Sequence, residues 1–191
     1  HTYSSKDGAM KRGKGDGTIA TDTFAWAIAA IGPETLAAQG MDPDGIMAFA
    51  EEQCRITTSF ARPNGEVVEV TGFDFAKARN APRGGVMSTE WTAQMAMAFK
   101  IMSDYHADRE DARKSEEYRK KAEFYLGELD KLVIASPSPS GQGAGCLPYA
   151  TVANADTGHG WRTPAGSSTG SVAGTAYTVF AKKGYNPLAL E

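Results

Sequence analysis

The residues from Phe24 to Ile31 (FAWAIAAI) are all apolar or alanine. A helix with no polar side must be buried on every side, so this run is expected at the centre of a globular core. It is far shorter than the roughly 20 residues that cross a bilayer, and no transmembrane segment is predicted elsewhere in the chain. Gly32-Pro33 ends the run, and Thr18 or Thr21 stands where an N-cap is expected.

Four later segments also show helical periodicity. Those near 88–105 and 171–183 are rich in Ala, Thr and aromatic residues and carry few charges, like the first helix. Those near 43–55 and 109–134 are amphipathic instead, with charges on one side. The alternation predicts three inner helices, starting near residues 19, 88 and 170, packed inside two amphipathic helices, of which 109–134 is the outermost.

A short β-hairpin is predicted between the second and third helices. Val67, Val68 and Val70 follow Pro63-Asn64-Gly65, and Asn-Gly is a frequent hairpin turn. Ser88 then stands at the start of the third helix, where a serine is a favoured N-cap. The hairpin is therefore expected to be an excursion between two helices.

Three other stretches lack periodicity and are expected to be surface loops. Residues 1–17 are rich in glycine, and residues 135–145 are rich in Ser, Pro and Gly. The third stretch, before the helix at 88–105, contains Asp74, Arg79 and Arg83. An ion pair that holds this loop is the simpler interpretation, and a substrate contact is the alternative.

The predicted inner helices begin alike, which suggests a repeated helical hairpin. Stacked hairpins bury a shared core that none could bury alone, so residues 1–191 are expected to form a single, mainly α domain. The similar starts are Thr23-Phe-Ala-Trp26, Thr89-Glu-Trp-Thr92 and Thr175-Ala-Tyr-Thr178.

Composition and motifs exclude several classes of function. The net charge is −3 with both signs interspersed, so no basic stripe is present and nucleic acid is not an expected partner. The chain lacks a P-loop, a Gly-x-Ser-x-Gly elbow and a dinucleotide fingerprint, so no cofactor is predicted. Cys54 and Cys146 have no Cys or His at zinc-ligand spacing, so no metal site is predicted. A disulfide between them and two separate thiols are both open.

Several motifs, in chain order, resemble a known family. They are Asp22-Thr-Phe-Ala-Trp-Ala-Ile-Ala-Ala-Ile-Gly-Pro33, Ser88-Thr-Glu-Trp-Thr-Ala93, Leu147-Pro-Tyr-Ala150 and Gly170-Ser-Val-Ala-Gly-Thr-Ala-Tyr177 with Gly184-Tyr-Asn-Pro187. Together they resemble the later hairpins of bacterial six-hairpin, (α/α)-toroid glycosidase-like proteins. The resemblance implies helical hairpins that form an (α/α)-toroid or an arc of one. Because fewer hairpins than six can be counted, it also implies contact with a missing N-terminal part or with copies of itself.

The same resemblance implies a carbohydrate partner and a secreted, periplasmic or cell-surface location. In such toroids the loops at the N-terminal ends of the inner helices line a central cleft that cleaves or modifies polysaccharide. The alternative is a non-catalytic glycan-binding or self-assembling cell-surface structural protein that keeps the cleft. A fold does not by itself decide between these functions.

Asp22 and Glu90 are the candidate catalytic pair. Cleavage of a glycosidic bond needs one carboxylic acid and one carboxylate. Each stands at the start of a predicted inner helix, close to Trp26 and Trp91 respectively, which could stack on a sugar ring. The simpler interpretation is that both acids favour the helix dipole. Because a helix N-terminus lowers a carboxyl pKa, a proton donor there would need burial to raise its pKa.

The loop at 156–164 (DTGHGWRTP) is the second candidate site. Its glycines would let the backbone approach a ligand closely. The alternative is a tight structural loop whose tryptophan plugs the end of the core. The candidate sugar-binding residues are Asp156, His159, Trp161 and Arg162 in this loop and, before it, Tyr149.

Overall fold

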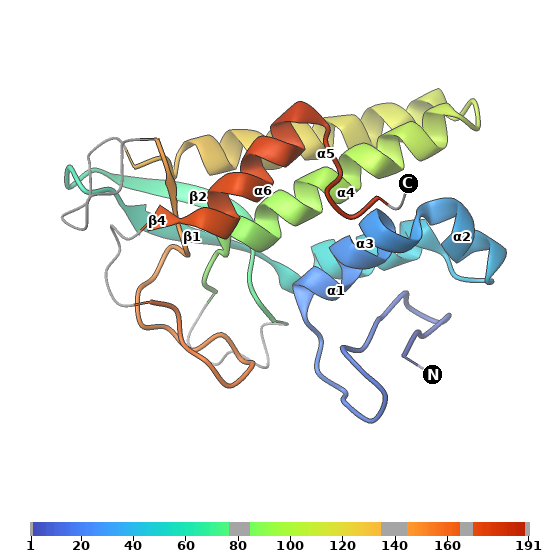
Figure 1. Cartoon of the computed structure of the whole chain (residues 1–191), viewed down its shortest axis with the longest axis horizontal. Coiled ribbons are helices and arrows are strands. Elements are labelled where there is room, and N and C mark those ends of the chain that lie inside the picture. Colours follow the sequence, from blue (N-terminus) through green and yellow to red (C-terminus); the bar gives the residue numbers. More distant parts are fainter. Residues whose placement is uncertain (1, 77–84, 135–144, 165–169, 190–191) are drawn as a thin grey trace.

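The computed structural model describes residues 2–76, 85–134, 145–164 and 170–189, which form a mainly α-helical fold with a small β-hairpin, as predicted (Figure 1). Arg79, Arg83 and most of the connector at 135–145 lie outside these residues. The helices are α1 (Thr21–Trp26), the π-helix η1 (Ala27–Ile31), α2 (Pro33–Ala38), α3 (Pro43–Cys54), α4 (Thr89–Ala107), α5 (Ala112–Asp130) and α6 (Val172–Lys183). The strands are β1 (Arg55–Ala61), β2 (Val67–Phe73), β3 (Leu147–Pro148) and β4 (Gly170–Ser171).

Helix α4 is the centre of the fold. It packs against α1, α5 and α6, and most of its side chains are buried (Figure 1). The Ser88 hydroxyl accepts a hydrogen bond from the Trp91 amide at 3.2 Å, which confirms the predicted N-cap. The Phe99 ring stacks on Tyr125 of α5 with centroids 5.5 Å apart. The prediction of a buried inner helix starting at residue 88 is confirmed.

Helix α5 lies on the outside of α4, as its charge pattern predicts. One stripe of α5 is buried and includes Tyr118, Ala122, Tyr125 and Leu129. Its remaining surface carries charged residues paired at helical spacing, as between Arg119 and Glu116 at 2.7 Å.

The apolar first helix differs from its prediction in two ways. Its N-cap is Ala20, and the Thr21 hydroxyl instead donates to the Asp74 carbonyl oxygen at 2.5 Å. The helix is also not buried on every side, because Trp26 and Ile31 are 45% and 50% exposed. From Ala27 it continues as a π-helix, a form that often occurs at functional sites. Its exposed apolar side therefore needs a function other than core packing.

Helix α2 was not predicted, since Pro33 was interpreted only as a stop signal. Proline is also favoured at the first position of a helix, where its missing N–H costs nothing, and Pro33 occupies that position in α2.

Helix α6 corrects the prediction of three inner helices. Val172 and Val179 are 87% and 48% exposed, so in the described structure α6 lies at the surface of α4 (Figure 1). A Cβ atom at Gly174 would lie 2.2 Å from the Thr89 hydroxyl oxygen, so glycine permits this close approach of the two helices. Gly184 ends α6 in the left-handed conformation, with φ of 67°.

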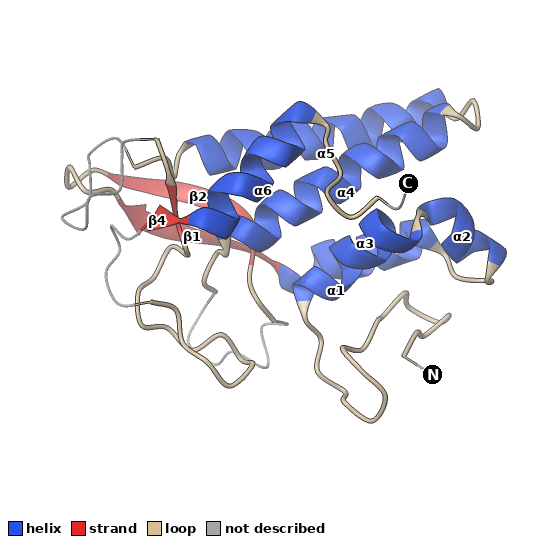
Figure 2. Ribbon diagram, viewed as in Figure 1, coloured by secondary structure: helices blue, strands red, loops and turns tan. Residues whose placement is uncertain are grey.

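The predicted β-hairpin is present (Figure 2). Strands β1 and β2 pair antiparallel, from Arg55 opposite Phe73 to Ala61 opposite Val67. Gly65 has φ of 87° in the turn, which suits a residue without a side chain. The hairpin packs on α4 and α5, so it extends the core instead of standing apart from it.

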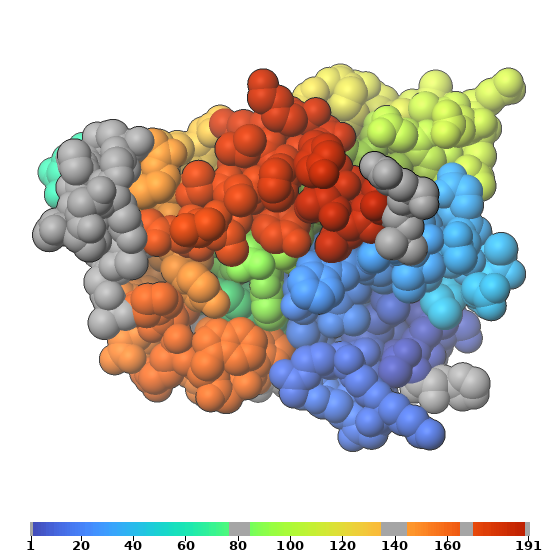
Figure 3. All heavy atoms as spheres, in the orientation of Figure 1, coloured from blue at the N-terminus to red at the C-terminus, as the bar shows by residue number. Residues whose placement is uncertain are grey.

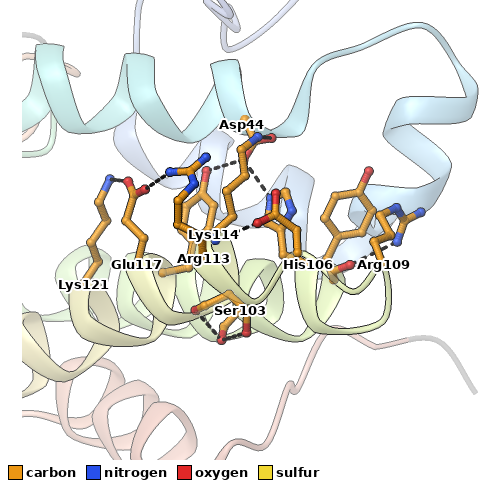
Figure 4. A network of polar contacts seen from close by, with 12 residues as sticks. Asp44, Ser103, His106, Arg109, Arg113, Lys114, Glu117 and Lys121 are labelled. Carbon is orange, nitrogen blue, oxygen red and sulfur yellow. Dashed lines mark hydrogen bonds and ion pairs between the residues drawn. The ribbon is translucent and has the colours of Figure 1, made fainter.

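A half-buried polar cluster fixes α3 to α4 and α5 (Figure 4). The Asp44 carboxylate of α3 accepts hydrogen bonds from Lys114 Nζ at 2.7 Å, the Tyr118 hydroxyl at 2.7 Å and His106 Nε2 at 2.9 Å. Burial opposes the charge, yet the hydrogen bonds from Lys114, Tyr118 and His106 hold the pKa of Asp44 below its usual value.

None of the helices in the described part of the chain has the length and apolarity needed to cross a membrane. Cys54 is fully buried in α3, and no disulfide joins it to Cys146.

Candidate functional site

The N-caps of α1, α4 and α6 share one conformation and one kind of contact. Ala20, Ser88 and Ser171 are all extended, with φ of −116°, −84° and −107°. Each also forms a β-bridge with a segment distant in sequence. The bridges join Ala20 to Ala76, Ser88 to Phe73 and Ala150, and Ser171 to Leu147. These pairings gather the helix starts at one end of the fold, beside residues 145–164 (Figure 1).

In α1 and α4 the first two residues after the N-cap also have the same side-chain roles. The Thr21 hydroxyl donates to the Asp74 carbonyl at 2.5 Å, and the Thr89 hydroxyl donates to the Pro148 carbonyl at 2.6 Å. The next residue is acidic in both helices: Asp22 after Thr21, and Glu90 after Thr89. The structural repeat is therefore an extended cap, a threonine and an acid. The similar sequences that begin at Thr23 and Thr89 are therefore two positions out of register. The structural counterpart of Thr89 is Thr21, because each is the first residue after its N-cap.

A pocket of about 440 Å³ opens at this end of the molecule. It contains all three tryptophans of the chain, together with Asp22 and the exposed side of α1 and η1. Four segments form it: the N-terminal segment, the first helix, the start of α4 and the loop at 156–162. Figure 3 shows the N-terminal segment in blue meeting residues 145–164 in orange. The lining residues include Arg12, Asp22, Trp26, Trp91, His159 and Trp161.

One wall of the pocket is formed where the N-terminal segment meets the loop at 156–162. Arg12 and His159 connect the two segments there. Arg12 Nη1 lies 3.2 Å from His159 Nδ1, and His159 Nε2 lies 2.7 Å from the Phe75 carbonyl oxygen. A carbonyl only accepts and a guanidinium only donates, so Nε2 carries the proton and Nδ1 accepts from Arg12. These two partners therefore fix the orientation of the imidazole ring.

Aromatic rings pack behind and along this wall. Phe75 lies at the centre, with its ring centroid 4.9 Å from that of Trp91 and 5.8 Å from that of Tyr149. The His159 ring stacks on Trp161 with centroids 5.2 Å apart. Trp91 is 7% exposed and Trp161 is 41% exposed, so Trp91 belongs to the core and Trp161 presents a face to solvent. Such exposure does not fit a tryptophan that plugs the end of the core.

Asp22 and Glu90 lie close enough to influence each other. Burial raises the pKa of Asp22 above its usual value. Burial also raises the pKa of Glu90, and the negative charge of Asp22 raises it further. Glu90 Oε1 accepts a hydrogen bond from Gln94 Nε2 at 3.1 Å. Desolvation therefore outweighs the helix N-terminus, and either carboxyl holds a proton more readily than an exposed acid does.

The other residues predicted to bind sugar have structural contacts and are not among those that line the pocket. Asp156 accepts a hydrogen bond from the Gly158 amide at 2.9 Å, which closes the loop on itself. Arg162 Nε donates to the Asn154 carbonyl at 2.9 Å. Tyr149 packs on Phe75. Glu90, predicted to be catalytic, is also not among the residues that line the pocket, and its carboxyl group is bonded to Gln94.

Sequence reasoning missed Arg12 and Phe75. Arg12 lies in an aperiodic, glycine-rich segment where no pattern distinguishes one basic residue from another. Phe75 was seen only as part of a polar loop, although the neighbouring Asp74 is buried and accepts hydrogen bonds from the amides of Phe75 at 2.7 Å and Val86 at 3.0 Å. Phe73, Asp74 and Phe75 are all buried although β2 ends at Phe73, so the polar Asp74 concealed a buried segment.

In the part of the chain that the structure describes, no cluster of three or more His, Cys, Asp or Glu side chains could hold a metal ion. Comparison of the chain with models of protein families, with curated proteins and with solved structures found no match. Its function is therefore inferred from the side chains that form the pocket.

Proposed function

We propose that this pocket binds a carbohydrate and that the chain acts on polysaccharide, with Asp22 and Glu90 as its acid and base. The observation that carries the proposal is the meeting of all three tryptophans with a half-buried carboxyl group, Asp22, in one open pocket. A volume of about 440 Å³ falls within the size of small-molecule sites, roughly 300–1,000 Å³.

The lining suits a sugar ring. Tryptophan faces pack on the apolar face of a pyranose, and they bury it without requiring hydrogen bonds. Trp26 and Trp161 present exposed rings on different segments of the pocket. Asp22 and Arg12 supply the few polar groups that would orient sugar hydroxyls.

The two carboxyls would divide the chemistry of cleavage. The protonated one donates its proton to the glycosidic oxygen, and the ionised one attacks the anomeric carbon or activates a water. Glu90 is the better donor, because both burial and the charge of Asp22 raise its pKa. Asp22 is the better base or nucleophile, because it lines the pocket and has the positive charge of Arg12 close by.

The proposal includes the fold family. The extended caps at Ala20, Ser88 and Ser171 support a helical hairpin repeated around an axis, as in an (α/α)-toroid or an arc of one. A secreted, periplasmic or cell-surface location, where polysaccharide is met, belongs to the same proposal.

A second candidate function is glycan binding without cleavage. The position of Glu90 favours it, because this carboxyl accepts a hydrogen bond from Gln94 and is not among the residues that line the pocket. In that case the exposed rings of Trp26 and Trp161 would hold a glycan chain and no bond would break.

The Glu90→Gln variant separates these two functions. The amide preserves the shape of the carboxyl but cannot donate a proton to the leaving oxygen, so we expect turnover to fall by about 10²-fold or more with binding retained. Glu52→Gln, on the exposed side of α3, is the matched control and should keep full turnover. Unchanged turnover in Glu90→Gln would remove Glu90 from the mechanism. Wild-type protein that binds glycans without cleaving any of them would favour the second function.

A further inference from the structure

The acidic and basic side chains around the pocket do not balance each other. Among the described residues that line it, Arg12 and Asp22 are the only Arg, Lys, Asp or Glu side chains. Arg12 is already neutralised, because its Nε and Nη2 atoms donate to Asp16 Oδ2 at 2.9 Å and 2.6 Å. Its remaining nitrogen, Nη1, donates to His159 at 3.2 Å. The guanidinium therefore has little left with which to hold an anion.

The remaining polar side chains near the pocket leave an excess of negative charge there. Both ring nitrogens of His159 are already in contact with protein atoms, Nε2 with the Phe75 carbonyl oxygen and Nδ1 with the Arg12 guanidinium. Within the described residues no side chain forms an ion pair or a hydrogen bond with the Asp22 carboxylate. Glu90 adds a second acid close by, since the negative charge of Asp22 raises the pKa of Glu90.

The aromatic lining of the pocket also favours a positively charged ligand. The faces of tryptophan rings are negative and attract cations, more strongly than those of other aromatic residues. Trp26, Trp91 and Trp161 surround the pocket that Asp22 enters. A carboxylate among tryptophan faces, whose nearby cation Arg12 is already paired with Asp16, is the arrangement that recognises a positively charged group.

We propose that the sugar bound in this pocket is cationic: a glycan of amino sugars whose amines are free and protonated. This inference rests on the proposed function, since it specifies which carbohydrate the site takes. The ammonium group would lie against the Asp22 carboxylate and a tryptophan face, and the ring would stack on the second tryptophan. An acetylated amine loses the charge, and a uronate would be repelled by Asp22.

Titration with three sets of oligosaccharides tests this directly. They are glucosamine oligomers with free amines, the same oligomers fully N-acetylated, and uronate oligomers of equal length, all at a pH that keeps the free amines protonated. We expect the free amines to bind roughly tenfold more tightly than the acetylated oligomers. The preference should weaken as salt is added, because part of it is charge attraction at an open site.

Variants assign the preference to one residue. Asp22→Asn should abolish the difference between free and acetylated oligomers while leaving the acetylated ones bound. Asp108→Asn removes the same charge from the exposed C-cap of α4 and should leave the preference intact. If Asp22→Asn does not fold, the salt dependence in the wild type still decides the question.

The outcomes separate the two proposals. Equal binding of free and acetylated oligomers would overturn the cationic preference and leave the carbohydrate function standing. Tighter binding of uronates than of free amines would also overturn the cationic preference and leave the carbohydrate function standing. If none of the oligosaccharides binds, both proposals fail. Binding of tetramethylammonium as tight as that of the amino-sugar oligomer would show that the site recognises the cation without the sugar, and would overturn this inference.

Discussion

Arg12 Nη1 lies 3.2 Å from His159 Nδ1, although the two residues are 147 positions apart in the chain. The contact joins the N-terminal segment to the glycine-rich loop at 156–162 across the mouth of the pocket. Both segments are loops, so the shape of the pocket depends on side-chain contacts between them as well as on the helices beneath.

Arg12→Ala should therefore weaken glycan binding more than it weakens the fold. The side chain of Arg12 is 43% exposed, so we expect a thermal midpoint within a few degrees of wild type. Affinity measured by calorimetry should fall by about tenfold, because the two loops lose the contact that aligns them. Lys11→Ala, the exposed neighbour, is the control. An unchanged affinity in Arg12→Ala would mean that the loops are aligned by other contacts.

Trp161→Ala and Trp91→Ala should have opposite profiles. Trp161 is 41% exposed, so its loss should eliminate detectable glycan binding with little change in thermal midpoint. Trp91 is 7% exposed and packs on Phe75, so its loss should cost about 3 kcal/mol of unfolding free energy. Thermal melts and binding titrations of both variants check this. A large loss of stability in Trp161→Ala would identify that residue as part of the core.

Glu90 should make stability depend on pH. Its pKa is higher in the folded than in the unfolded chain, so the folded state is penalised when the group ionises. The penalty is absent below the unfolded pKa, about 4.3, and grows as the pH rises through the folded pKa. Glu90→Gln should therefore have a higher thermal midpoint than wild type near neutral pH, with the difference vanishing near about pH 4. A difference that does not vary with pH would contradict the buried, charged state of Glu90.

Asp44 should show the opposite dependence. Its pKa is lower in the folded chain, so its contribution to stability is present above the unfolded pKa, about 3.9, and is lost as the pH falls through the folded pKa. Asp44→Asn should cost about 2 kcal/mol near neutral pH, because hydrogen bonds from Lys114, Tyr118 and His106 lose a charged acceptor. Denaturant unfolding measures this, with the exposed Asp104→Asn as control. Equal losses in both variants would mean that the cluster adds no stability.

Much of the fold could be predicted from local pattern. The Ser88 cap, the apolar period of α4, the stripe of α5 and the Asn64-Gly65 turn each act over a few residues, and the structure has all four. The exposure of α6 could not be predicted in this way. Val172 and Val179 are apolar, and composition alone does not say whether such a side faces the core or solvent.

The candidate site was predictable in part for a similar reason. Asp22, Trp26, Trp91, His159 and Trp161 were chosen by residue type at helix starts and in one unusual loop, and all of them line the same pocket. That they would meet follows from β-bridges between segments far apart in sequence, which no local pattern encodes.

Arg12 shows the limit of sequence reasoning most clearly. Its segment has no period, and its role comes only from where the fold brings His159 and Asp16. Asp156 and Arg162 show the converse. Their residue types suit a ligand, but their hydrogen bonds to Gly158 and Asn154 hold the loop in shape.

The most direct test of the account uses the tryptophans themselves. All three tryptophans of the chain line the pocket, so the intrinsic tryptophan fluorescence of the protein reports on that site alone. Titration with an oligosaccharide should change the emission in a saturable way, and Trp161→Ala should remove the response. Saturable binding detected by calorimetry without any change in tryptophan emission would place the glycan elsewhere and contradict the central claim that this pocket is the binding site.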